Sequence, residues 1–222
     1  MLKSKFKDLL ILVKMTTLAY PKSEAAILPT PDPIYYQAGD EPDMIELTPI
    51  TYLSLAGIGA PDEARFINSI EAIYAVAYNL KFTSKYAGKD FIVPKIEAQW
   101  WSETGLSLDI TPQAEWYWNI LIRLPEFIGT KEVDKAVEEV IHKSNITLAA
   151  EVLLTTLDEG KCVQVLHLGP GEEQLVMEKI MEYMDTNNLK VNGCLHEIYI
   201  TAPHQASSKQ SKTIIRYPVS KA

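Results

Sequence analysis

Residues 162–190, CVQVLHLGPGEEQLVMEKIMEYMDTNNLK, repeat the pattern of residues 52–81, YLSLAGIGAPDEARFINSIEAIYAVAYNLK. Each stretch begins with an apolar, strand-like run, turns at glycine and proline, and continues into a helix with an acidic start. Apolar residues recur at helical spacing in both helices, and both stretches end on NLK. This self-similarity predicts an internal duplication.

Further strand-like segments complete each unit. Residues 91–101 and 114–124 follow the first helix, and the runs CLHEIYITAP and KTIIRYPV follow the second. The resulting order is strand, helix, strand, strand, found twice. We therefore predict an α+β fold in which the two units form one antiparallel sheet, with the helices on one face and a ligand cleft on the other.

The proline content divides the chain into an arm and a domain. Residues 20–49 carry many prolines and lack hydrophobic periodicity, which predicts an extended N-terminal arm over residues 1–46 that either wraps the domain or stays mobile. The domain is expected at 47–222, with halves at about 47–128 and 147–222. A helix at 131–143, KEVDKAVEEVIHK, joins them.

The net charge and the positions of the cysteines and histidines argue against several classes of function. The net charge is −8, with 29 acidic against 21 basic residues, which argues against a nucleic acid partner. Cys162 and Cys194 form no CxxC pair, and the four histidines are scattered, so we expect no disulfide framework, no metal and no cofactor. The apolar run Leu9 to Val13 is too short for a secretion signal, and no run spans a bilayer. We expect a cytoplasmic protein without a membrane partner.

Two strands combine acidic and aromatic residues on one side. In VPKIEAQWW, residues 93–101, alternation places Glu97 with Trp101, and in HEIYI it places Glu197 with Tyr199. Aromatic rings stack on planar or cationic molecules, and a partly desolvated carboxylate pairs with a cation or takes up a proton. These faces are therefore candidates for one cleft. The alternative is ordinary strand packing, with each glutamate on a solvated face.

Five motifs in order carry a family resemblance: VPKIEAQWW, WYWNILIRLPEFI, CVQVLHLGPGEE, HEIYITAP and KTIIRYPV. From about residue 47 to the C-terminus the chain resembles the GyrI-like small-molecule-binding proteins in their stand-alone form. The resemblance implies two pseudo-symmetric units with an aromatic, acidic cleft between them. Glu197 matches the position of the family's cleft glutamate.

Some stand-alone members similar to this chain are hydrolases that open strained cyclopropane rings in DNA-alkylating natural products. By this resemblance Glu97 and Glu197 are the acid/base candidates, and Trp100 belongs to the core. The cleft walls implied are Trp101, Tyr117, Trp118 and Tyr199. Lys95, Ala98 and Tyr117 depart from the family pattern, which leaves the substrate range open.

Three functions remain open from the sequence. The first is a detoxifying hydrolase for cyclopropane-bearing alkylators. The second is a non-catalytic module that senses or sequesters hydrophobic, planar or cationic small molecules. The third is a topoisomerase-interacting protein.

Overall fold

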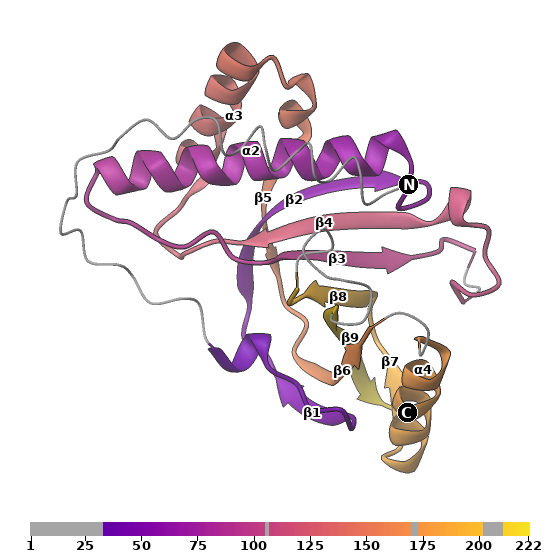
Figure 1. The fold of residues 1–222 in the computed structure, drawn as a ribbon. Coiled ribbons are helices and arrows are strands. Elements are labelled where there is room, and N and C mark those ends of the chain that lie inside the picture. The colour runs from indigo at the N-terminus through magenta and orange to yellow at the C-terminus, as the bar shows by residue number, and fades with distance from the viewer. Residues whose placement is uncertain (1–32, 105–106, 170–172, 202–210) are drawn as a thin grey trace.

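The computed structural model describes residues 33–104, 107–169, 173–201 and 211–222. Its strands form an antiparallel sheet in the order β1-β6-β9-β8-β3-β4-β2-β5, and β7 pairs with β9 (Figure 1). The predicted α+β class with an antiparallel sheet is confirmed.

The first unit contains β2 (Ile50–Ile58), α2 (Ala64–Tyr86), β3 (Ile96–Trp101) and β4 (Tyr117–Arg123), with the short helix η2 (Gln113–Glu115) before β4. Two glycines allow its compact start. A Cβ at Gly57 would lie 2.3 Å from ring atoms of Trp118, and Gly59 has φ +117 where the chain leaves β2 for the helix. Gly57 therefore leaves room for the Trp118 ring, and Gly59 allows the turn from β2 into α2.

The second unit contains β6 (Lys161–Leu168), α4 (Glu173–Thr186), β7 (Leu189–Val191), β8 (Leu195–Tyr199) and β9 (Lys212–Lys221). In the sheet, β6-β9-β8 is followed by β3-β4-β2. Each unit thus places its first strand, β6 or β2, farthest from the centre, while β8 and β3 lie side by side at the centre. This mirrored order is what the duplicated sequence pattern predicts.

The connection between the units consists of α3 (Thr130–Ser144), η3 (Thr147–Glu151) and β5 (Leu153–Leu157). Helix α3 packs on α2, and β5 pairs with the outer edge of β2. The predicted linking helix at 131–143 lies within α3. At the opposite edge, β1 (Asp43–Glu46) pairs with β6.

Helices α2 and α4 cover the same face of the sheet. A row of paired residues crosses it from Leu55 in β2 through Ile120, Ala98 and Glu197 to Ile215 in β9. Leu55, Ile120 and Ala98 belong to the core cluster packed with α2, and Ile215 belongs to the cluster packed with α4. We call this side the helix face.

The opposite face is covered at its centre. A third cluster there contains Tyr35, Ile50, Tyr52, Leu121, Ile198 and Ile214. Tyr35 comes from η1 (Pro33–Tyr36), which lies in the arm predicted over 1–46. Residues 33–46 thus pack against the sheet, while residues 1–32 lie outside the described residues. In the described part of the chain no helix has the length and apolar character of a membrane span.

Candidate functional site

Glu197 lies on the helix face in the central strand β8. It is paired with Ala98 of β3 on one side and Ile215 of β9 on the other. Leu195, two residues before it, packs against both helix-face clusters. Glu197 itself is partly exposed. It therefore occupies the junction of the two units with solvent access.

One oxygen of Glu197 is held by two donors. The Tyr199 hydroxyl donates to Oε2 at 2.6 Å, and the indole Nε1–H of Trp100 donates to the same atom at 3.1 Å. No described residue donates a hydrogen bond to Oε1. The carboxylate is thus fixed in direction by one oxygen, and the other remains available for a water molecule or a ligand.

The protein around Glu197 alters its acidity. Burial raises the pKa of Glu197, and the hydrogen bonds from Tyr199 and Trp100, with the electrostatic effects of His167 and His196, only partly offset this rise. Burial, together with the nearby Glu197 charge, raises the pKa of Tyr199, which keeps its hydroxyl protonated as a donor. Glu197 is therefore a carboxylate whose protonation is shifted toward neutral pH.

Trp100 is buried in the hydrophobic core, as expected from the sequence. Its side chain is 5% exposed, stacks on Phe66 at 5.2 Å and meets Trp116 edge-on at 5.9 Å. Offset and edge-to-face aromatic pairs resist reorientation. The indole N–H consequently points at Glu197 from a rigid support.

The sheet separates the other predicted site residues from Glu197. Glu97 and Trp101 of β3 and Tyr117 of β4 lie on the opposite face, where the rings of Trp101 and Tyr117 stack at 5.7 Å. Trp118 is on the helix face but has no exposed surface, and it packs edge-on against Phe66. Of the predicted site residues, only Tyr199 lies on the helix face in contact with Glu197.

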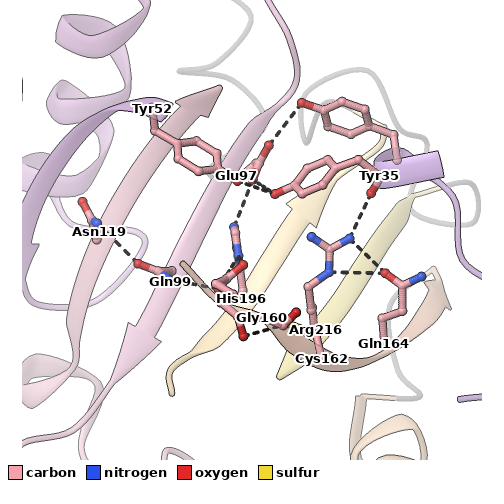
Figure 2. Close-up of polar contacts among 12 residues, drawn as sticks. Tyr35, Tyr52, Glu97, Gln99, Asn119, Gly160, Cys162, Gln164, His196 and Arg216 are labelled. Atoms are coloured by element: carbon pink, nitrogen blue, oxygen red, sulfur yellow. Dashed lines mark hydrogen bonds and ion pairs between the residues drawn. The ribbon is translucent and has the colours of Figure 1, made fainter. Parts of the chain in front are cut away.

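Glu97 belongs to a second, buried polar cluster (Figure 2). Its side chain is fully buried, accepts hydrogen bonds from Tyr35 at 2.7 Å and Tyr36 at 3.3 Å, and lies 3.0 Å from His196 Nε2. The other ring nitrogen of His196 lies 3.0 Å from Glu159. An imidazole with a carboxylate at each nitrogen must carry both protons, so His196 is a cation here.

Arg216 supplies the second buried positive charge on this face. It donates to Gln164 Oε1 and to the backbone carbonyl of Tyr35 at 2.9 Å each, and its guanidinium carbon lies 4.4 Å from the Tyr35 ring centroid. Arg123 approaches the same ring at 4.8 Å. These contacts attach η1 to the centre of the sheet.

The profile of the GyrI-like small molecule binding domain matches residues 40–220. The chain belongs to that family. The structure of an uncharacterised conserved protein from Listeria innocua is similar at TM-score 0.78 and 30% identity, over 84% of this chain and 96% of that one. Among curated proteins no match was found.

Two structures described as hydrolases from Listeria innocua are also similar to this GyrI-like chain. They align at TM-scores 0.76 and 0.74 with 30% and 29% identity, and each alignment covers 84% of this chain and 95% of the other. The family, a small-molecule-binding domain, is thereby established, and the hydrolase description belongs to those neighbours.

Sequence reasoning missed most of the buried cluster in this GyrI-like domain. The histidines lack metal-binding spacing, and the signal that could have found His196 is its place directly before Glu197, where alternation puts it on the opposite face. Glu159 and Tyr35 carried no local signal. In the described part of the chain, no group of His, Cys, Asp and Glu side chains has an arrangement that could hold a metal.

The buried cation predicts a pH-dependent stability. Burial opposes the charged imidazole, but Glu159 and Glu97 outweigh it and raise the pKa of His196 from 6.5 to about 9. The folded state therefore holds this proton more tightly than the unfolded state. The stabilisation is complete below pH 6.5 and is lost as pH rises through about 9.

We expect the free energy of unfolding in urea to fall across this pH interval, by on the order of 3 kcal/mol from this one group. His196→Gln should remove most of that pH dependence. His142→Gln, at an exposed position of α3, is the matched control and should retain it. Equal pH dependence in His196→Gln and the wild type would contradict the assigned charge.

Proposed function

We propose that this GyrI-like protein binds a planar, hydrophobic electrophile on the helix face beside Glu197 and hydrolyses its strained ring. The supporting observation is the state of the Glu197 carboxylate. Two donors occupy Oε2, while Oε1 accepts no hydrogen bond from the described residues and the side chain is partly exposed. Such a group is oriented and still reachable.

Glu197 acts as the general base in this proposal. It takes a proton from a water molecule whose oxygen attacks a cyclopropane carbon, and one ring bond breaks as the new carbon–oxygen bond forms. A raised carboxyl pKa makes the carboxylate a stronger base at neutral pH, which favours this transfer. Trp100 and Tyr199 keep the carboxylate in place while the proton moves.

The class of reaction is supported by similarity as well as geometry. The Listeria innocua neighbours described as hydrolases align over most of this chain. The motif resemblance singles out cyclopropane-bearing DNA alkylators as substrates, and aromatic surface at Tyr199 suits a planar ring system. Detoxification of such compounds is the role that follows.

The testing experiment is incubation of the purified protein with a cyclopropane-bearing alkylator. Chromatography with mass detection should show a product heavier by one water, formed faster than without protein. Isothermal titration with the same compound measures binding separately. Tight binding with no product would exclude the hydrolytic function and favour a non-catalytic binding module.

A cation-binding module is the second candidate. Its support is the same partly exposed carboxylate beside the Tyr199 ring, because carboxylates and aromatic faces both attract cations. A bulky lipophilic cation would then bind and undergo no chemistry. The same titration, repeated with that cation, distinguishes the two candidates.

Tyr199→Phe tests the support of the carboxylate. The change removes the 2.6 Å hydrogen bond to Glu197, and hydrogen bonds to charged groups contribute about 1.5–3 kcal/mol. We expect ring opening to slow by roughly 10-fold or more. Because this bond lowers the pKa of Glu197, the acidic limb of the kcat–pH profile should move to higher pH.

Tyr117→Phe, on the opposite face, is the matched control for this variant. It should change neither the rate nor the profile. A Tyr199→Phe protein with the wild-type pH profile would show that the hydroxyl does not support the working carboxylate.

A further inference from the structure

His167 is a buried histidine on the helix face that none of the contacts above uses. It lies near the end of β6, its side chain is 9% exposed, and its Nε2 is buried without a hydrogen-bond partner among the described residues. A buried polar group without a partner costs about 1–3 kcal/mol. His167 Nε2 thus lacks a compensating hydrogen bond among the described residues.

The strand register places His167 on the same side as Glu197. His167 is paired with Thr213 of β9, and Thr213 is paired with Tyr199 of β8. Neighbouring strands lie about 4.8 Å apart, so the backbones at His167 and Tyr199 are separated by roughly 10 Å. That span matches the width of a fused aromatic ring system.

The residues between His167 and Glu197 on this face are not fully buried. Thr213 and Tyr199 are both partly exposed, and Thr213 is a small side chain. Helix α4 packs further along the strands, on Val163, Val165 and Ile215. A ligand lying over Thr213 would thus contact Glu197 and Tyr199 on one side and His167 on the other.

His167 also acts on Glu197 electrostatically. The electrostatic interaction with His167 lowers the pKa of Glu197 and partly offsets the rise caused by burial. His196 acts on Glu197 in the same sense from the opposite face, but both of its ring nitrogens are engaged by carboxylates. His196 lies on the opposite face with a carboxylate 3.0 Å from each ring nitrogen, so His167 is the one of these two histidines that shares the helix face with Glu197.

We propose that His167 is a second catalytic residue of this site, which donates a proton from Nε2 to the substrate as the ring opens. The inference rests on the hydrolytic function proposed above and assigns its acid. A cyclopropane becomes electrophilic when it is conjugated with an acceptor such as a carbonyl group. Its opening therefore needs a proton at the acceptor oxygen as well as a base for the water.

The step balances with these two residues. Water oxygen forms a bond to the cyclopropane carbon, and its proton goes to Glu197. The electron pair of the broken carbon–carbon bond moves through the conjugated system to the carbonyl oxygen, which takes the proton of His167. Return of a proton from Glu197 to His167 through solvent restores both residues, so the net reaction adds one water.

His167→Gln tests the assignment with a carbonyl-conjugated cyclopropane substrate. General acid catalysis contributes about 10²–10⁴-fold, so kcat should fall by at least about 100-fold. The ligand dissociation constant, measured by titration with the slow variant, should stay within about threefold of the wild-type value. His142→Gln is the matched control and should behave as wild type.

A series of substrates with different acceptor substituents distinguishes a general acid at position 167 from a residue that only supports the fold. Electron-withdrawing substituents on the acceptor stabilise the negative charge on its oxygen, so such substrates need the acid less. The defect of His167→Gln should therefore shrink along the series, whereas a fold defect would slow all members equally. His167→Asn, with thermal unfolding recorded for each variant, provides a second test if His167→Gln folds poorly.

Three outcomes would overturn the proposal. Wild-type kcat in His167→Gln, or an equal defect across the substrate series, would exclude His167 as the general acid. Neither result would contradict the proposed hydrolytic function. Absence of ring opening by the wild-type protein removes the proposed function and this inference together. A defect that shrinks along the series, with binding retained, supports His167 as the acid.

Discussion

Glu197→Gln should reduce ring opening of a cyclopropane-bearing alkylator by about 10²–10⁴-fold, the range that loss of general base catalysis produces. Glutamine keeps the shape of the side chain and still accepts hydrogen bonds from Tyr199 and Trp100 at the Oε2 position. It cannot take a proton from water. Binding of an uncharged alkylator should stay within about threefold of wild type, so the loss appears in kcat.

Single-turnover kinetics and titration calorimetry on the same preparations measure both quantities. Glu115→Gln, at an exposed position before β4, is the matched control and should leave them unchanged. Wild-type turnover in Glu197→Gln would exclude this carboxylate as the base. A variant that turns over slowly but also loses a cationic ligand would favour the cation-binding module.

Glu97→Gln should lower the free energy of unfolding by about 3 kcal/mol, the lower end of the cost of breaking a buried ion pair. The side chain is fully buried on the face opposite Glu197, with His196 Nε2 at 3.0 Å. Removing its charge leaves the imidazolium with Glu159 as its remaining carboxylate, and it weakens the anchor for the Tyr35 hydroxyl.

Urea unfolding of Glu97→Gln, His196→Gln and the double variant measures this coupling directly. Because both residues serve one interaction, the double variant should lose at least about 1 kcal/mol less than the sum of the single variants. Glu115→Gln should change stability by less than about 0.5 kcal/mol. Additive losses would show that Glu97 and His196 act independently.

The duplicated pattern of the sequence predicted most of the fold. Alternation was also correct within each strand, since Glu97 shares a face with Trp101 and Glu197 with Tyr199. What alternation cannot supply is the register between β3 and β8. Ala98, not Glu97, is paired with Glu197, and a shift of one residue reverses the face of every side chain.

Local sequence patterns could not predict the buried polar cluster around Glu97 and His196, for a different reason. Its members come from η1, β3, β8, β9 and the turn at Glu159, so only the tertiary fold brings them together. Tyr35 lies in a proline-rich segment without periodicity, which the sequence identified only as an arm. A family resemblance located Glu197, but the donors that orient it depend on the packing of Trp100.

A crystal structure of Glu197→Gln with an intact cyclopropane-bearing alkylator tests the central claim most directly. The variant should hold the ligand without opening it. We predict the compound on the helix face, in contact with Tyr199 and with the reactive ring beside position 197. A ligand bound on the opposite face, between Trp101 and Tyr117 or in place of Tyr35 beside Glu97, would contradict the proposed site.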